Sequence, residues 1–250
     1  MAERARGGRS IRYREIADAL RDSVSTGALA AGRLLPSEAE LSATYAVSRV
    51  TVRRALELLR DEGLVDSRQG FGWFVATVPV RQVLGRLGTI EEQMAASGLR
   101  PERRVLDFAF VQPTVRVRQL LGTDQVLRVR RVNLADGEPF ARVTVWCPAE
   151  LAVDVSRADV ERSPFYELLP VSLAAATQTI GAAAASADDA TVLRIPVGSP
   201  VLRCERVTSD VAGRVVLVST HVFPAHRTEF VVELAQADRS IAPSGLRLVE

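Results

Sequence analysis

The sequence predicts two domains: a small helical domain that ends in a β-hairpin, and a larger α+β domain built on a mostly antiparallel sheet. Residues 35–75 place a capped helix, a tight turn, an arginine-rich helix and a glycine-punctuated hairpin end to end. Beyond about residue 100, β-prone runs dominate and helical patterns become few. With 250 residues and 47% hydrophobic content, the chain is long enough to bury two cores.

Three helices are predicted in the first domain. Residues 13–24 carry apolar side chains at the spacing of one helix face. The second helix begins at Ser37, whose hydroxyl can accept from the amide of Glu40 while the Glu40 carboxylate returns to the Ser37 amide, a capping box. After a short turn, Ser48 can cap a third helix over residues 49–62.

The third helix has an inward and an outward side. Four apolar residues at helical spacing face inward, namely Val52, Ala55, Leu56 and Leu59. The outward side gathers hydroxyl and guanidinium groups in the first turns, which is typical of a recognition helix that reaches base edges in the major groove. Arginine can grip guanine O6 and N7 together. The candidate DNA contacts of the helical part are Ser37, Ser48, Arg49, Thr51, Arg53 and Arg54.

Two short β-prone runs around a glycine-containing turn follow this helix. They predict a hairpin whose tip, residues 68–72, is the wing. We expect Arg68 and the backbone at Gly70 and Gly72 to lie near phosphates or the minor groove. The first domain, residues 10–77, is therefore predicted to be a winged helix-turn-helix that binds double-stranded DNA.

Charge supports DNA binding only weakly, because the formal net charge is +2. The basic excess lies near the start of the chain, at Arg4, Arg6, Arg9, Arg12 and Arg14. Residues 1–9 are predicted to be a disordered basic arm. Such an arm either follows the DNA backbone or stays solvated, and the sequence leaves both open.

The second domain is predicted over residues 89–245, after a linker at residues 78–88 that carries proline and glycine. Thr89 can cap a short helix at residues 90–96. Strands are predicted at residues 104–111, 126–134, 140–146, 201–208 and 215–223, with hairpin turns at Asp136-Gly137 and Ala212-Gly213. Further helices are predicted at residues 164–169, capped by Ser163, and at residues 187–194, capped by Ser186.

The first domain resembles the DNA-binding domain of GntR-type bacterial transcription regulators. The resemblance rests on Leu35-Pro36-Ser37-Glu38-Ala39-Glu40-Leu41, on residues 47–56, on Glu62-Gly63-Leu64-Val65 and on Gly70-Phe71-Gly72. It implies base or phosphate contacts for Arg49, Arg53, Ser48 and Thr51, and operators that resemble GT-N-TA-N-AC. Ala39 departs from subfamilies that place a DNA-contacting arginine there.

The second domain is similar to the UTRA effector domain of the HutC subfamily. The similarity rests on residues 89–94 with Gly98, on residues 130–140, on Ser163-Pro164-Phe165-Tyr166-Glu167-Leu168-Leu169 and on residues 195–202. It implies a chorismate-lyase-like fold used as a small-molecule receptor, and a homodimer formed largely through this domain.

Strand periodicity independently indicates a pocket. On the strand that begins at residue 126, the odd-numbered face runs Leu127, Val129, Arg131, Asn133, so it begins apolar and turns polar. Such polar residues either line a cavity or reach water at the sheet edge, and the pattern alone leaves both open. The resemblance favours the cavity. The candidate effector contacts are Thr89, Arg131, Asn133, Ser163, Tyr166, Leu217 and Phe223.

The resemblance also implies a ligand class, because family members that bind phosphosugars use an arginine with two hydroxyls, a sound anion site. Where such members carry acidic residues this chain has Val143 and Leu217, and Phe223 stands where a tyrosine is usual. The hypothesis is a small anionic metabolite with a more apolar body than a phosphosugar. The alternative is a DNA-binding dimer whose second domain only dimerises and binds no effector.

An enzyme is the competing class, because the chorismate-lyase-like fold includes a lyase. His221 and His226 stand five residues apart, which on a strand places them on opposite faces, and no acidic cluster joins them. Each is predicted to be structural, and no metal or cofactor is expected. All 32 basic residues are arginine, which excludes lysine-dependent catalysis.

The sequence predicts a cytoplasmic, ligand-responsive transcription factor that acts as a repressor. Cys147 and Cys204 lie in apolar runs and are expected to be buried, reduced thiols. The chain shows neither a charged-then-apolar leader nor an apolar run long enough to span a bilayer.

Overall fold

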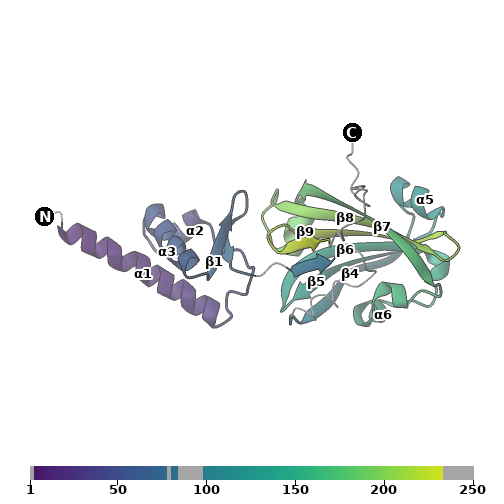
Figure 1. Cartoon of the computed structure of the whole chain (residues 1–250), viewed down its shortest axis with the longest axis horizontal. Coiled ribbons are helices and arrows are strands. Elements are labelled where there is room, and N and C mark those ends of the chain that lie inside the picture. Colours follow the sequence, from purple (N-terminus) through teal and green to yellow (C-terminus); the bar gives the residue numbers. More distant parts are fainter. Residues whose placement is uncertain (1–2, 78–79, 84–97, 233–250) are drawn as a thin grey trace, which may run out of the picture.

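The computed structural model describes residues 3–77, 80–83 and 98–232, in which two bodies lie end to end (Figure 1). The first body, here called the head, contains α1 (Glu3–Ser25), α2 (Glu38–Thr44), α3 (Arg49–Asp61), β1 (Val65–Arg68) and β2 (Gly72–Val75). β1 and β2 pair antiparallel, so the predicted winged helix-turn-helix is confirmed.

One apolar core joins the three helices of the head to its hairpin. Its buried members are Ile16, Ala17, Leu20, Leu35, Leu41, Val52, Ala55, Leu56, Leu59, Val65 and Val75. The capping box of Ser37 with Glu40 is present, and Ser48 caps α3, both as predicted. The predicted disorder of residues 1–9 is wrong from Glu3 onward, since α1 begins there. Extending an existing helix adds one hydrogen bond per residue and needs no new nucleus.

A short parallel strand pair follows the head. β3 (Val80–Val83) lies within the segment predicted as linker and pairs with β10 (Thr228–Val231), the last described strand. The segment that enters the second body is therefore hydrogen-bonded to the segment that leaves it. The predicted helix at residues 90–96 lies outside the described residues.

The second body is built on a six-stranded antiparallel sheet in the order β4-β5-β6-β9-β8-β7. Its strands are β4 (Pro101–Val111), β5 (Val126–Ala135), β6 (Glu138–Pro148), β7 (Leu173–Ala184), β8 (Pro200–Asp210) and β9 (Val215–Pro224). The turn from β5 to β6 at Asp136-Gly137 has φ values of 49° and 81°, as a tight hairpin requires. All five predicted strands are present, which confirms the mostly antiparallel α+β domain.

Short helices cover both faces of this sheet. The elements are α5 (Val115–Leu121), the 3-10 turn η1 (Ala149–Leu151), α6 (Arg157–Arg162), the 3-10 turn η2 (Phe165–Glu167) and α7 (Ala187–Leu193). Val160 of α6 and Phe165 of η2 pack into the main core, which we call the core face of the sheet. α5 packs against Val126 and Val218 on the opposite face.

Neither β7 nor α5 is predicted from the sequence. β7 is rich in alanine, which has no strand preference, and it is a strand because it pairs along its length with β8. α5 alternates valine and arginine like a strand, yet its first turn is capped by Thr114 and it ends at Gly122 with a φ of 66°.

The helix predicted at residues 164–169 is wrong. The helix in this region is α6, which begins at a capping box of Ser156 with Asp159, and Ser163 follows its last residue. Pro164 has an extended backbone, with φ −57° and ψ 137°, so only the single turn η2 follows. The helix predicted from Ser186 is present as α7, with its capping box to Asp189.

Both cysteines are free and buried, as predicted. Burial raises the pKa of Cys147 and of Cys204 to about 12, so both thiols stay protonated at neutral pH. Across the described ranges, the structure contains no helix that is both long and apolar enough to cross a membrane.

Candidate functional site

The first candidate surface is the start of α3, where hydroxyl groups fix the helix ends. Ser48 Oγ accepts from the amide of Thr51 at 3.3 Å and lies 2.9 Å from Thr51 Oγ1. Ser37 Oγ accepts from the Glu40 amide at 3.2 Å at the start of α2. These three predicted DNA contacts therefore also orient the two helices of the helix-turn-helix.

Arg53 lies on the outward side of α3 and is held by α2. Its Nε donates to Glu38 Oε1 at 2.9 Å and its Nη2 donates to Glu38 Oε2 at 2.7 Å. The same carboxylate accepts from Trp73 Nε1 at 3.2 Å, so α2, α3 and β2 meet at Glu38. The bond from Arg53 is the main reason that the pKa of Glu38 is lowered. The Arg53 side chain is still 62% exposed, which leaves its outer edge open to a base or phosphate.

The neighbouring side chains of α3 point in different directions. Arg49 is exposed in the first turn. The Arg54 guanidinium lies over the ring of Tyr13, 5.4 Å from its centroid, so α1 holds it. Val50, which is not among the predicted DNA contacts, is 76% exposed. An outward apolar side chain at that position can contact a thymine methyl group, and its place between Arg49 and Thr51 is the signal that marks it.

The wing lies against the second body. Arg68 Nη1 donates to the carbonyl of Ala225 at 3.0 Å. Phe71 is only 5% exposed and packs with residues of the second body, namely Ala185, Leu193, Ile195, Val201 and Val222. Gly70 and Gly72 are exposed and have positive φ values of 78° and 90°, which glycine adopts without strain.

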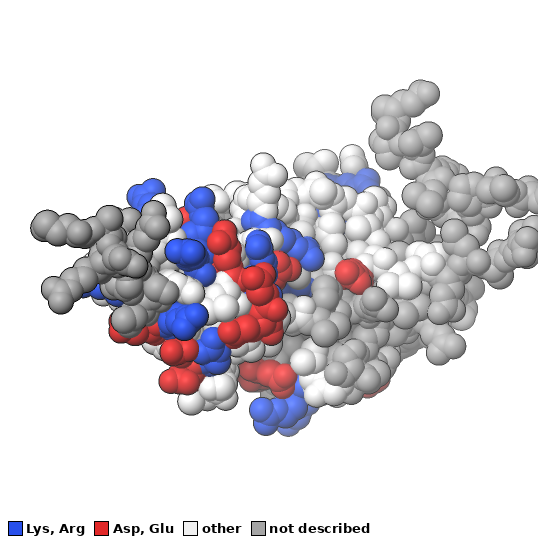
Figure 2. All heavy atoms as spheres, turned by 60° about the vertical axis from the view of Figure 1, so that its left-hand side comes forward, with Lys and Arg blue, Asp and Glu red and all other residues white. Residues whose placement is uncertain are grey.

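Charge on the head is mixed. Figure 2 shows acidic and basic side chains interleaved on the face turned to the viewer, without a broad basic field. This agrees with the formal net charge of +2. DNA binding by such a surface depends on the placement of individual arginines more than on long-range attraction.

The second candidate site is a polar patch on the core face of the sheet. Arg131 and Asn133 of β5 are 7% and 1% exposed and lie on the same face as Leu127 and Val129. The residues directly opposite Arg131 are Val105 on β4 and Val143 on β6. The change from apolar to polar along this strand thus lies inside the domain, away from water at the sheet edge.

The strand register adds four polar residues to this patch. His221 of β9 pairs with Val143, so it stands in the same cross-strand row as Arg131. The next row contains Ser219, Arg206 and Gln178. Ser219 Oγ lies 3.1 Å from His221 Nε2, and Arg206 Nε donates to Gln178 at 2.8 Å. Burial lowers the pKa of Arg206.

Sequence reasoning misses these four residues and treats His221 as a structural histidine. Alternation within each strand shows that they share a face with apolar neighbours. It cannot show which strands are adjacent, because the pairing of β6 with β9 joins segments that are far apart in the sequence. His226, the second histidine of the pair, lies beyond the end of β9 and contacts the head.

The apolar members of the predicted effector set border the polar patch. Leu217 and Phe223 are 8% and 1% exposed and belong to the main core on the same strand as His221. The Phe223 ring stacks on the His221 ring with a centroid distance of 5.9 Å. Cationic, hydroxyl and imidazole groups therefore adjoin an apolar wall.

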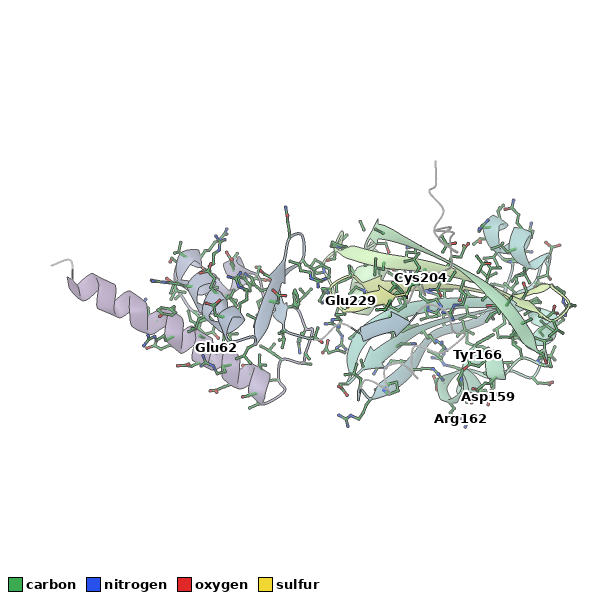
Figure 3. The ribbon with its side chains drawn as sticks, viewed as in Figure 1. Glu62, Asp159, Arg162, Tyr166, Cys204 and Glu229 are labelled. Atoms are coloured by element: carbon green, nitrogen blue, oxygen red, sulfur yellow. The ribbon has the colours of Figure 1, made fainter. Side chains whose placement is uncertain are left out.

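The remaining predicted effector residues come from the segment around α6. Ser163 and Tyr166 are both half-buried. Figure 3 shows Tyr166 next to Asp159 and Arg162 of the α6 helix, with Cys204 on the sheet. Thr89 lies outside the described residues. Chemically, the patch offers buried hydrogen-bond donors suited to an anion.

Two family models match the chain. The model of bacterial regulatory proteins, gntR family, matches residues 12–75, and the UTRA domain model matches residues 96–229. The chain is 30% identical over 227 residues to the HTH-type transcriptional repressor NagR of Bacillus subtilis, covering 88% of this chain and 93% of that protein. It is 34% identical over 244 residues to an HTH-type transcriptional regulator of Mycobacterium tuberculosis, covering 94% and 89%. The crystal structure of PhnF from Mycobacterium smegmatis aligns with a TM-score of 0.60 at 25% identity, covering 88% of this chain and 99% of that one.

Proposed function

Because this chain belongs to the GntR family of bacterial regulatory proteins and is a DNA-binding transcription regulator with an effector-binding UTRA domain, we propose that a small anionic metabolite controls its affinity for a palindromic operator. Its relatives are regulators rather than enzymes. The proposed action is repression, the action that the name of NagR states for that protein.

The observation that carries the anionic ligand is the burial of Arg131. Its guanidinium is always charged, it is 7% exposed, and the side chains directly opposite on both neighbouring strands are valines. A buried guanidinium is a strong hydrogen-bond donor to an anion. Arg206, in the next row of the same face, adds a second cation. A carboxylate or phosphate is the ligand group that two such cations favour.

The apolar wall supports a ligand body with few hydroxyl groups. Leu217 and Phe223 supply hydrocarbon and an aromatic ring beside the cationic patch, and Val143 stands in the row of Arg131. These side chains offer no donor or acceptor to a sugar hydroxyl. Selectivity for an apolar body follows, because a sugar hydroxyl buried there would lose its hydrogen bonds to water.

We further propose that the chain acts as a cytoplasmic homodimer. A two-fold dimer presents two α3 helices to half-sites about one helical turn apart, which matches a palindrome. The effector would favour a dimer geometry in which the two heads no longer match that spacing. Such a shift requires the ligand to bind the two geometries with different affinities.

The DNA-binding part is tested by fluorescence anisotropy. Purified protein is titrated into a duplex that carries a GT-N-TA-N-AC palindrome and into a scrambled duplex of equal composition, at several salt concentrations. We expect tighter binding to the palindrome, with two protomers per duplex. Equal and wholly salt-governed binding to both duplexes would contradict the proposed operator.

The effector part is tested by thermal unfolding against a panel of sugar phosphates, apolar carboxylic acids and uncharged analogues. A ligand at 100 times its Kd adds about 2.7 kcal/mol to the native state. We expect the apolar acids to stabilise the protein and to release it from the operator. Equal stabilisation by sugar phosphates would overturn the apolar body, and stabilisation by no anion would favour a second domain that only dimerises.

A further inference from the structure

Three consecutive residues of the second body, Ala225, His226 and Arg227, contact the head, and we call them the joint corner. The corner lies between the end of β9 and the start of β10. It falls where the head meets the sheet domain in Figure 1. Every residue of the corner contacts the head through a hydrogen bond or a ring contact.

Arg227 bridges the two bodies. It is 7% exposed, its Nε donates to the carbonyl of Gly32 in the head at 2.8 Å, and its Nη1 donates to the carbonyl of Pro139 in β6 at 2.8 Å. Burial lowers its pKa to about 10, which leaves it charged at neutral pH. Hydrogen bonds from a charged donor are the stronger kind, so this side chain is well suited to hold the bodies together.

His226 holds the wing from inside the joint. Its ring lies 4.0 Å from the Phe71 ring and 4.9 Å from the Phe74 ring, between centroids. It is 1% exposed, and its Nε2 lies 3.1 Å from the Gly32 carbonyl. Phe71 lies in the turn of the hairpin and Phe74 in β2, so His226 contacts both the tip and one strand of the wing.

The wing contributes one apolar and one charged group to the joint. Phe71 belongs to an apolar cluster whose buried members otherwise come from the second body, and it is not part of the head core. Arg68, the predicted wing contact to DNA, donates to the Ala225 carbonyl. Contact of Nη1 with a phosphate or the minor groove requires this bond to break. Docking and DNA contact therefore compete for this nitrogen of Arg68.

We propose that the joint corner is an autoinhibitory latch, which holds the wing on the second body and must open when the wing binds DNA. The proposal rests on the proposed function. β9 connects the latch to the polar patch, since it carries Ser219 and His221 and runs directly into the corner. A ligand that moves β9 changes the position of the corner.

The test uses the full chain with Phe71→Ala. This variant removes the apolar contact of the wing with the second body and keeps Arg68, the predicted DNA contact. Phe110→Ala is the matched control, because Phe110 is 50% exposed on β4 and is not among the residues of the joint. We expect Phe71→Ala to bind the palindromic duplex about tenfold more tightly, a change of about 1.4 kcal/mol. We expect Phe110→Ala to bind like the wild type.

A second variant and a second measurement show whether tighter binding comes from opening of the joint and not from a local change in the wing. Arg227→Met removes the bonds from the second body to the head and should also tighten binding to the palindromic duplex. Hydrogen–deuterium exchange, measured without DNA, should become faster at residues 225–231 in both variants. In the wild type, exchange at residues 225–231 should become faster when the duplex is added.

The outcomes separate the latch from the regulator function. Absence of a palindrome preference in the wild type contradicts the proposed operator binding. A wild type that prefers the palindrome, with folded variants that bind equally or more weakly, overturns the latch. Unchanged exchange at residues 225–231 in both variants overturns it as well.

Discussion

The two nitrogens on one edge of the Arg53 guanidinium face the two carboxylate oxygens of Glu38, at 2.9 and 2.7 Å. The pair joins α2 to α3, the recognition helix. Because Arg53 is 62% exposed, solvent screens the pair and the pair itself adds little stability in water. Its effect is to orient the guanidinium, so that its free edge is presented in one direction.

Arg53→Ala should remove operator binding without changing dimerisation. Loss of a bidentate base contact costs about 1–3 kcal/mol per site and relaxes specificity there. Two protomers double that loss, which is enough to abolish the preference for the palindrome. Anisotropy measures the affinity, and sedimentation measures the oligomeric state. Arg162→Ala is the control, since Arg162 is an exposed arginine of the second body, and it should bind the operator normally.

Arg131→Ala should leave operator binding intact and weaken release by the effector. The variant removes the buried cation that the proposed ligand requires, and the head core contains no residue of β5. The matched control is Arg128→Ala, on the same strand but on the opposite face, where Arg128 pairs with Asp107. Release should be normal in the control. A broad loss of thermal stability in Arg131→Ala alone would show that Arg131 is structural.

Local chemistry explains what the sequence predicts correctly. The capping boxes at Ser37 and Ser186 are built from residues three positions apart, so they are legible without any knowledge of the fold. The five strands with alternating or continuous apolar residues can be predicted for the same reason, because their pattern is local in sequence.

Long-range pairing explains what the sequence does not predict. His221 joins the row of Arg131 only because β6 lies between β5 and β9. Phe71 looks like an ordinary wing residue until its partners appear more than 100 residues later, at Ala185 and beyond. The alanines of β7 become a strand through pairing with β8, against their own preference.

Gly32→Ala should destabilise the joint more than Gly27→Ala destabilises the head. Both glycines have a positive φ, 74° and 76°, so each substitution costs about 1–2 kcal/mol of backbone strain. A Cβ at Gly32 would lie 2.8 Å from Nε of Arg227, whereas one at Gly27 meets nothing within 4 Å. Arg227 is bonded on both sides and cannot easily move. Crowding should add about 1–3 kcal/mol at Gly32.

Denaturant unfolding of the two glycine variants measures this difference. The Gly27 variant isolates the backbone cost, so subtraction leaves the crowding at Arg227. Equal losses of stability in the two variants would show that Arg227 moves aside freely.

Acid should loosen the joint through His226. Burial, followed by the neighbouring Arg227, lowers the pKa of this imidazole to about 3, while the Gly32 carbonyl opposes the shift and Arg68 adds to it. An unfolded histidine takes up its proton near pH 6.5, so the unfolded state binds more protons between about pH 6.5 and 3. Stability from this group is present above pH 6.5 and is lost as the pH falls. At pH 5 the loss is about 2 kcal/mol.

The measurement compares the wild type with His226→Phe, which keeps an aromatic ring against Phe71 and Phe74 but cannot titrate. Thermal unfolding is followed between pH 7 and 5. Acid effects of other groups are common to both proteins, so the wild type should lose more stability than the variant. Parallel pH profiles would mean that His226 stays neutral by another route or is exposed in solution.

The parallel pairing of β3 with β10 also sets an order of events during synthesis. The two strands are separated in sequence by the strands of the second body, so they can pair only after those residues have been made. The contacts of the head are local by comparison, and domains generally fold as units, N-terminal first. On the ribosome the head therefore becomes able to bind DNA before anything restrains it. The restraint at the joint forms only after β10 has been made and has paired with β3.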